Sequence, residues 1–392
     1  MISSVTLKIV VIGVGIIGPR HAKHVIENPH TDLFGIVDPG PAGPGVAKEL
    51  KVDHFSSIQN MIQFCNETNT NYPDGAIVCT PNSTHVKVAA ELASHGIHLL
   101  VEKPLSPSPA EAIALKNYVD SKGVKLLVGH HRRFNPHIVA TKENLHKVGK
   151  IIAVQGTWTL RKPSAYFESA TWRTDINTGG GVLMINLIHD IDLLQYMFGP
   201  IERVYAELLP KQKLQYPNVD EGAVLTIRFK SGTCGTFVCS DSVTSPFNFE
   251  SGTGENPTIP HHEDLEGLYR IFGTEGTLSV PDFTLYHQQS NGECKQEEPS
   301  WLNPIQRESV VKDRDLELHS HLPFDLQLNH FVDVIRGNVD PFCSAQDGMS
   351  SSLCIEAVLK SIETELPQRV SDCSTIKPDY ESLGLKEKLN LP

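Results

Sequence analysis

Three stretches of the chain combine glycine, charged and imidazole side chains in patterns that could carry chemistry. In the first, Gly13-Val14-Gly15-Ile16-Ile17-Gly18, the first glycine permits a tight turn and the second lets the backbone approach a pyrophosphate. The third glycine permits close packing of the following helix, whose first N–H groups and partial positive charge face the phosphates. The run predicts a dinucleotide site that includes Gly13, Gly15, Ile16, Ile17 and Gly18.

Asp38 stands about 20 positions beyond the glycine run, where such sites place an acidic residue. A carboxylate there can bind both ribose hydroxyls of NAD, and it repels the 2′-phosphate of NADP. The following Pro39-Gly40-Pro41 offers no arginine to hold that phosphate. We therefore expect NAD as the cofactor, with NADP as the less favoured alternative.

The second stretch is a pair of polar groups that each follow an apolar run. Thr80-Pro81-Asn82 and His85 follow Gly75–Cys79, and Glu102-Lys103-Pro104 follows His98–Val101. An open parallel sheet presents its ligand-binding groups at the carboxyl ends of its strands. A lysine in that place, preceded by a carboxylate, could polarise a substrate hydroxyl and help to tune its acidity. A solvated surface lysine is the alternative interpretation.

The third stretch, Gly179 to Asp192, begins with three glycines and continues as a helical pattern. Asn186 and His189 could share one face of this helix, because positions three apart are neighbours. A histidine that titrates near neutral pH suits the removal of a proton from an alcohol, whereas a packed core histidine is the alternative. We expect Asp190 and Asp192 to be structural, bonding backbone or a basic neighbour.

The elements that must position these groups change character along the chain. Up to about residue 130, short runs of Val, Ile and Leu alternate with helical patterns, as in a doubly wound parallel sheet covered on both faces. The predicted strands are Lys8–Ile12, Leu33–Val37, Gly75–Cys79, His98–Val101 and Val124–Gly129. The predicted helices are Ile17–Asn28, Ile58–Asn66, His85–His95 (capped by Ser83 or Thr84) and Pro109–Lys122 (capped by Ser108).

Beyond about residue 135, repeated hairpins predict a largely antiparallel sheet. Its strands are Ile151–Leu160, Ile201–Leu209, Ala223–Phe229, Thr233–Ser240, Leu268–Phe272, Thr277–Val280 and Phe283–His287. Helices are predicted at Val182–Met197, Phe324–Arg336 and Ala345–Thr364. Residues 244–266 and 290–320 are predicted as long loops, and residues 366–392 as a peripheral tail.

The composition excludes several classes of protein. A chain of 392 residues suits two domains, and 40% hydrophobic with 20% charged residues is typical of a soluble globular protein. The net charge of −12 argues against nucleic-acid binding, and no apolar run is long enough to cross a bilayer, so we expect a cytoplasmic protein. The scattered cysteines indicate reduced thiols. No zinc site is expected, because the histidine pairs lack a third ligand at a recognisable spacing: His21 with His24, His130 with His131, His261 with His262, and His319 with His321.

Together the motifs resemble those of the glucose-fructose oxidoreductase, inositol dehydrogenase and rhizopine-catabolism (Gfo/Idh/MocA) oxidoreductases over about residues 7–365. The matching pieces are Gly13–Gly18, Thr80-Pro81-Asn82 with His85, Glu102-Lys103-Pro104, Gly179–Asp192, and the interdomain link Gly129–Pro136. The resemblance implies a Rossmann domain (1–130) and an α+β domain (131–365) that binds substrate and forms homodimers or homotetramers through its open sheet.

The resemblance also implies roles for particular residues. Lys103 would contact the reacting hydroxyl and the nicotinamide ribose, His189 would be the acid/base residue, and Glu102 and Pro104 would shape the cofactor pocket. Where relatives similar to inositol dehydrogenase carry an Asp four residues before the histidine, this chain has Ile185, with Asn186 beside it. A neutral amide cannot act as a base, so Asn186 is expected to orient the substrate instead.

A group of aromatic and basic residues near the glycine–histidine stretch suits a sugar or cyclitol ring, and packing in a surface loop is the alternative for any one of them. Its members are Trp158, Arg161, Tyr166, Trp172 and Arg173, and we add His131 to the expected substrate contacts. The sequence thus predicts an NAD-dependent dehydrogenase acting on a sugar or polyol. The alternatives are a non-catalytic NAD-binding regulator, as in the galactose-pathway repressors of yeast that resemble this family, and a glycosidase that uses bound NAD for transient oxidation.

Overall fold

The computed structural model describes residues 5–288, 300–311 and 322–385, which form two compact units. The first unit comprises the described residues of Met1–His131, Pro323–Ser352 and Asp372–Pro392, and the second those of Arg132–Leu322 and Leu353–Ser371. The expected division therefore differs from the structure in where it placed residues 323–352 and 372–385. Apolar periodicity predicts a helix but does not tell which sheet that helix covers, so this assignment needed the tertiary structure.

The first unit is built on a parallel sheet of six strands in the order β3-β2-β1-β4-β5-β6. Its central strands are almost continuous runs of buried Val, Ile and Leu, as the sequence predicted for a sheet with helices on both faces. The strands are β1 (Leu7–Ile12), β2 (Thr31–Val37), β3 (Asp53–Phe55), β4 (Gly75–Val78), β5 (His98–Val101) and β6 (Leu126–Val128). The helices are α1 (Gly18–Glu27), α2 (Gly43–Leu50), α3 (Ile58–Thr68), α4 (His85–Ser94), α5 (Pro109–Ser121) and α10 (Pro323–Ile335).

Local details of this unit differ from the expected ones. The sequence predicts no element between Asp38 and Ile58, where the structure has α2 and β3. Helix α2 was not predicted because it begins with Gly43-Pro44-Gly45, residues that are typical of turns, and β3 was not predicted because it is only 3 residues long. The expected cap of α4 is also wrong. Thr84 Oγ1 lies 2.7 Å from the Pro81 carbonyl oxygen, to which its hydroxyl can donate, and 2.8 Å from Thr80 Oγ1, and no side chain caps the helix. Ser108 caps α5 as predicted.

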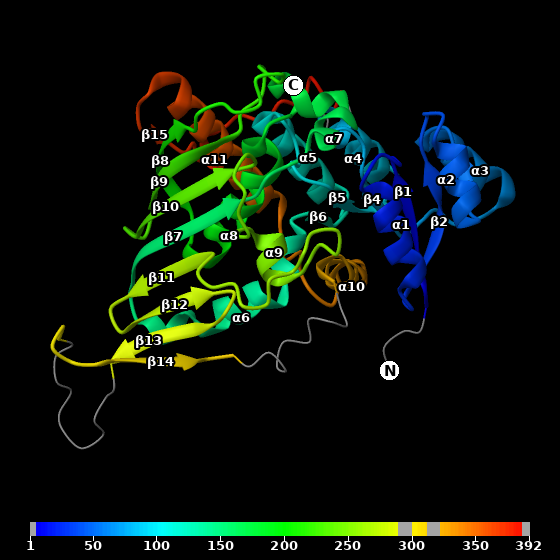
Figure 1. The fold of residues 1–392 in the computed structure, drawn as a ribbon. Helices are drawn as coiled ribbons and strands as arrows, with labels where there is room; N and C mark the ends of the chain where they lie inside the picture. The colour runs from blue at the N-terminus through cyan, green and yellow to red at the C-terminus, as the bar shows by residue number, and fades with distance from the viewer. Residues whose placement is uncertain (1–4, 289–299, 312–321, 386–392) are drawn as a thin grey trace. The chain divides into compact units, whose positions relative to one another are not determined.

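The second unit contains a sheet of nine strands in the order β14-β13-β12-β11-β7-β10-β9-β8-β15, which can be followed from end to end in Figure 1. Only the β10–β7 pair is parallel among the registered pairs, so the prediction of a mostly antiparallel sheet is confirmed. The strands are β7 (Ile151–Thr159), β8 (Ile201–Leu208), β9 (Gly222–Phe229), β10 (Cys234–Ser240), β11 (Tyr269–Gly273), β12 (Gly276–Val280), β13 (Thr284–Gln288), β14 (Ile305–Ser309) and β15 (Gln368–Arg369).

One face of this sheet carries the core. Alternate residues of β9 are buried and pack with apolar residues of α8 (Ile188–Phe198) and α11 (Ala345–Thr364). The predicted helix Val182–Met197 begins as a π-helical turn, Leu183–Leu187, and continues as α8. The remaining helices of this unit are α6 (Pro136–Asn144), α7 (Ser164–Glu168) and α9 (Phe249–Thr253).

Three segments predicted to lack regular structure contain short elements. Helix α9 lies in the expected loop 244–266, and its Phe-Glu-Ser-Gly-Thr sequence shows no helical periodicity. Strand β14 lies in the expected loop 290–320, where every one of its residues is exposed and so no apolar alternation is visible. Strand β15 lies in the expected tail and pairs with β8. Cys294, His319, His321 and much of the loop 290–320 lie outside the described residues.

Candidate functional site

The glycine turn after β1 has the geometry that a dinucleotide requires. Gly13 has φ +91°, and a Cβ there would lie 2.8 Å from the Cys79 carbonyl oxygen. A Cβ on Gly18 would lie 2.0 Å from the Gly13 carbonyl oxygen, so the turn closes on itself. A Cβ on Gly15 would meet no atom within 4 Å, which leaves its backbone open to a pyrophosphate. The residues present fit a dinucleotide.

The start of α1 is available to an anion. Ile16 is exposed and Ile17 is half-buried, and no side chain caps the helix at Ile17. Pro19 occupies the first turn, where a missing N–H costs nothing. The remaining N–H groups at the helix start can therefore donate to phosphate oxygens.

Asp38 follows β2 and is held against the glycine turn. Its Oδ2 accepts the Val14 N–H at 2.7 Å, and its Oδ1 accepts the Gly40 N–H at 2.6 Å. Each carboxylate oxygen retains a further lone pair that can accept a ribose hydroxyl. Two backbone bonds thus orient the carboxylate.

The polar group after β4 is divided between surface and interior. Thr80 and Asn82 are half-buried and Pro81 is exposed, whereas His85 is buried. His85 Nδ1 lies 2.8 Å from the Pro104 carbonyl oxygen, and Nε2 lies 2.8 Å from the Thr80 carbonyl oxygen. Both ring nitrogens face backbone carbonyls, so the ring lies between the two loops that carry them. The cofactor contact of His85 stays a prediction. Burial lowers the pKa of His85, although the hydrogen bonds to the two carbonyls oppose the shift.

The group after β5, Glu102-Lys103-Pro104, is hydrogen-bonded to α1, the helix that follows the glycine turn. Glu102 is buried, and its Oε1 lies 2.8 Å from Nε2 of His21 on α1, while its Oε2 accepts the Lys103 N–H at 3.2 Å. Burial would raise the pKa of Glu102, but the hydrogen bond from His21 and the charges of His21 and Lys103 outweigh it and lower the pKa. An ionised Glu102 thereby fixes the backbone of Lys103, whose half-buried side chain carries three donors.

Helix α10 adds an aromatic residue that the sequence analysis did not identify. The Phe324 ring stacks on His131 with 4.3 Å between ring centroids, and the Arg20 guanidinium lies 4.1 Å from its centroid. The phenyl ring thus holds His131, an expected substrate contact, beside the first turns of α1. Phe324 is about 300 residues from Arg20 in the chain, and nothing in its local sequence marks it.

In the second unit, the glycine run Gly179-Gly180-Gly181 makes close backbone approaches. A Cβ on Gly180 would lie 2.6 Å from the Trp172 carbonyl oxygen, and one on Gly181, where φ is +91°, would lie 2.0 Å from Asp220 Oδ2. Asp220 Oδ1 accepts the Leu183 N–H at 3.0 Å and so caps the π-helical turn. Burial raises the pKa of Asp220 to about 6. Sequence analysis missed Asp220 because it lies 37 residues from the N–H that it caps.

Asn186 and His189 follow this run as predicted, in the π-helical turn and the first turn of α8. His189 is buried, with 7% of its surface exposed, and Asn186 is half-buried. Asn186 Oδ1 accepts a hydrogen bond of 2.7 Å from Nζ of Lys162, a buried lysine that the sequence analysis passed over in favour of its neighbour Arg161.

The two aspartates after His189 are structural, as the sequence predicted. Asp192 forms a two-bond ion pair with Arg133 (2.8 and 2.7 Å). Asp190 accepts from the Tyr269 hydroxyl and lies 3.5 Å from Arg132. These buried pairs fix α8 to the segment that begins the second unit.

Arg132 forms ion pairs with three buried carboxylates, Asp190, Glu250 and Glu255. Glu250 and Glu255 also pair with its guanidinium, the latter at 2.9 Å. Burial raises the pKa of Asp190 to about 7, and the negative charges of Glu250 and Glu255 raise it further. The charge of Arg132 and the hydrogen bond from Tyr269 oppose this shift. Burial also raises the pKa of Glu255.

The predicted aromatic and basic group forms only in part. Arg173 stacks on the ring of Tyr166, 3.9 Å from its centroid, and lies 5.6 Å from that of Trp172. Arg161 is exposed, and its backbone forms an isolated antiparallel β-bridge with Ser242. Trp158 belongs to the core instead: it is fully buried and donates to Glu250 at 2.8 Å. The sequence placed Trp158 in the group suited to a sugar ring because aromatic and basic residues cluster nearby, whereas its indole lies in the core.

The described residues contain neither a cluster of metal ligands nor a helix that could span a membrane. Within residues 5–288, 300–311 and 322–385, no three His, Cys, Asp or Glu side chains gather in an arrangement that could hold a metal ion. None of the helices in the described part of the chain combines the length and apolar character that a membrane span requires. The seven cysteines in these ranges carry free thiols.

Comparison with known proteins decides the family. A family model described as "Oxidoreductase family, NAD-binding Rossmann fold" matches residues 7–130, and its partner, "Oxidoreductase family, C-terminal alpha/beta domain", matches residues 142–369. The chain belongs to the Gfo/Idh/MocA oxidoreductase family. This confirms the resemblance seen in the motifs and the assignment of an NAD-binding Rossmann domain.

Individual Gfo/Idh/MocA relatives are similar at low identity. The chain is 28% identical over 347 residues to scyllo-inositol 2-dehydrogenase (NAD(+)) of Bacillus subtilis, covering 86% of this chain and 88% of that protein. It is 26% identical over 208 residues to scyllo-inositol 2-dehydrogenase (NADP(+)) IolW of the same organism, covering 53% and 57%. The WlbA dehydrogenase of Bordetella pertussis, solved with NADH and UDP-GlcNAcA, has the same fold, with a TM-score of 0.70 and 21% identity over 93% of this chain and 99% of that one.

Proposed function

We propose that this oxidoreductase transfers hydride between a secondary hydroxyl of a sugar, sugar derivative or cyclitol and NAD. The observation that carries the proposal is the fastening of Lys103: ionised Glu102 binds both His21 of the glycine-turn helix and the Lys103 N–H. A lysine at the carboxyl edge of the sheet is thereby tied to the element that faces the dinucleotide. The nicotinamide, when bound, supplies the hydride acceptor or donor.

The remaining roles follow from the chemistry of each side chain. The Lys103 ammonium donates to the substrate hydroxyl and polarises it, and His189 takes up the proton when the alcohol is oxidised. Asp38 accepts the ribose hydroxyls, which favours NAD over NADP. Tyr166, Trp172 and Arg173 contribute aromatic faces and a cation to substrate binding. Pairing of two or four copies through the nine-stranded sheet is part of the same proposal, since alternate residues of β9 are exposed.

The test is a panel of inositols, aldoses and uronic acids with NAD or NADP, followed by the appearance of reduced cofactor. In Lys103→Met, kcat on the best substrate should fall roughly 10²–10⁴-fold, because the charge that stabilises the developing alkoxide is removed. The Kd for NAD should change little. Lys87→Met, at an exposed lysine of α4, is the matched control. Unchanged turnover in Lys103→Met would contradict the mechanism.

A second candidate rests on position 185, where a carboxylate is absent and the adjacent Asn186 is already engaged by Lys162. A protein without the proton-relay carboxylate could bind NAD as a regulator. Tight NAD binding without turnover on the panel, together with a protein partner recovered by pull-down, favours that function. Release of free sugar from an aryl glycoside without net NADH identifies instead a glycosidase that uses bound NAD.

A further inference from the structure

Lys162 is a buried cation beside the glycine–histidine stretch. Only 9% of its surface is exposed, and its Nζ lies 2.7 Å from Oδ1 of Asn186, three positions before His189. An ammonium group has three donors and no acceptor, so the amide atom that faces it must be the oxygen. The contact therefore fixes which way the Asn186 amide is turned.

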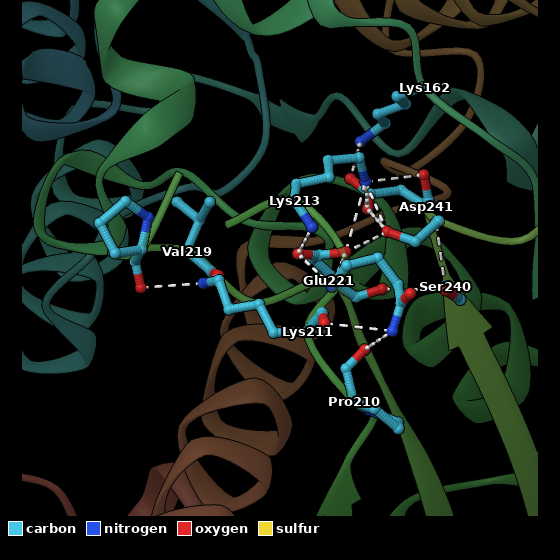
Figure 2. Close-up of polar contacts among 11 residues, drawn as sticks. Lys162, Pro210, Lys211, Lys213, Val219, Glu221, Ser240 and Asp241 are labelled. Carbon is cyan, nitrogen blue, oxygen red and sulfur yellow. Dashed lines mark hydrogen bonds and ion pairs between the residues drawn. The ribbon is translucent and has the colours of Figure 1, made fainter. Parts of the chain in front are cut away.

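A network of charged side chains also contacts the Lys162 amine. Asp241 Oδ2 lies 3.5 Å from Lys162 Nζ, and the Asp241 carbonyl accepts the Lys162 N–H at 2.9 Å. Lys213 Nζ lies 2.6 Å from Asp241 Oδ1 and 3.8 Å from Glu221 Oε2. Figure 2 shows these two lysines and two acids gathered in one polar cluster. The Lys162 amine also lies 4.6 Å from the centre of the Tyr166 ring, a favourable cation–π distance.

This arrangement determines which hydrogen bonds Asn186 can offer. Its oxygen is taken by Lys162, and in the described part of the chain its Nδ2 has no hydrogen-bond partner, although the side chain is only half-buried. The amide thus presents two N–H donors, while Lys162 occupies one of the two lone pairs of its oxygen. An aspartate in the same place would present only acceptors, so the polarity of this position is the reverse of that of a carboxylate.

We propose that Lys162 is a positioning residue that turns the Asn186 amide so that Nδ2 donates to an acceptor oxygen of the substrate. The proposal deepens the proposed function and rests on it. It implies a substrate with a carboxylate, carbonyl, ring or hydroxyl oxygen that accepts a hydrogen bond beside the reacting carbon. Lys162 acts through Asn186 and has no role in proton transfer.

The test compares Lys162→Met, Asn186→Leu and the double variant on the best substrate of the panel. Each single variant should raise KM for the substrate about tenfold, the worth of about one hydrogen bond, with a smaller effect on kcat. Because Lys162 acts only through the amide, the double variant should be no worse than Asn186→Leu alone. Lys213→Met is the matched control: it disturbs the same Asp241 without touching Asn186, so it should lose comparable thermal stability and keep the wild-type KM.

Two results would overturn the proposal. One is a KM for Lys162→Met no higher than that of Lys213→Met, and the other is additive losses in the double variant, which indicate independent roles. Failure of the proposed function is a different outcome, since it leaves the wild-type protein without turnover on the whole panel. In that case the affinity of the same variants for the panel compounds in the presence of NADH, measured by calorimetry, applies the same comparison to binding alone.

Discussion

Replacement of Arg132 by methionine should destabilise the protein in a strongly pH-dependent way. In the wild type, Arg132 pairs with Asp190, Glu250 and Glu255, all of them buried. Burial raises the pKa of Asp190 from 3.8 to about 7, so its neutral form is favoured in the folded state. The stability that this group contributes is complete below its unfolded-state pKa and is lost as the pH rises through about 7.

Without the guanidinium, the pKa values of Asp190 and Glu255 should rise further, because attraction to Arg132 opposes the effect of burial on both. Leaving buried carboxylates uncompensated costs about 3–5 kcal/mol once they must ionise. That free energy corresponds to a fall in Tm of roughly 6–20 °C for a domain of this size. Well below pH 7 the raised pKa of Asp190 favours its neutral form, and the loss should approach that of the missing hydrogen bonds, about 1–3 kcal/mol.

The assay is thermal and urea unfolding of wild type and Arg132→Met at about pH 5 and about pH 8, on either side of the Asp190 titration. Arg133→Met is the matched control, because it leaves a single carboxylate, Asp192, without its two-bond partner. Its loss of stability should grow less between the two pH values. An equal loss at both pH values in Arg132→Met, or a pH dependence no larger than that of Arg133→Met, would refute the reasoning.

Two further substitutions test single contacts. Asp38→Ser should weaken NADH binding roughly 10- to 100-fold, because it removes a charged acceptor worth about 1.5–3 kcal/mol. The affinity for NADPH should stay the same or increase. Fluorescence titration measures both affinities, and an equal fall for the two cofactors contradicts the role of Asp38. Gly181→Ala should cost more than about 2 kcal/mol in urea unfolding, because its Cβ would lie 2.0 Å from Asp220 Oδ2. Gly232→Ala, with a similar positive φ and open space around the Cβ, should cost less, and equal costs would show that backbone strain alone is responsible.

Much of the fold could be predicted because its signals are local. Buried parallel strands such as β1 and β4 are short continuous apolar runs, and the 20-residue helix α11 has the predicted bounds. What failed depends on tertiary context. The exposed edge strand β14 has no apolar alternation, and α10 has a clear apolar face but no signal that it belongs with the first unit.

The site divides in the same way. The glycine turn and Asp38 could be predicted because Rossmann spacing brings them together, and the structure joins them through the Val14 N–H. His85 was found, and both of its ring nitrogens lie 2.8 Å from carbonyl oxygens, whereas a sequence cannot tell whether an imidazole nitrogen faces a ligand or a carbonyl. Lys162 was missed because its partner lies 24 residues further along the chain, and neither residue carries a local signal of the contact.

The most direct test of the central claim is the fate of the hydrogen on the reacting carbon. The best substrate of the panel, prepared with deuterium on its hydroxyl-bearing carbon, is oxidised with NAD, and the NADH is analysed by NMR and mass spectrometry. A dehydrogenase that transfers hydride predicts one deuterium at C4 of the nicotinamide ring, and formation of this labelled NADH that is roughly 10²–10⁴-fold slower with Lys103→Met. NADH that forms without deuterium, or deuterium that appears in the solvent, would contradict direct hydride transfer.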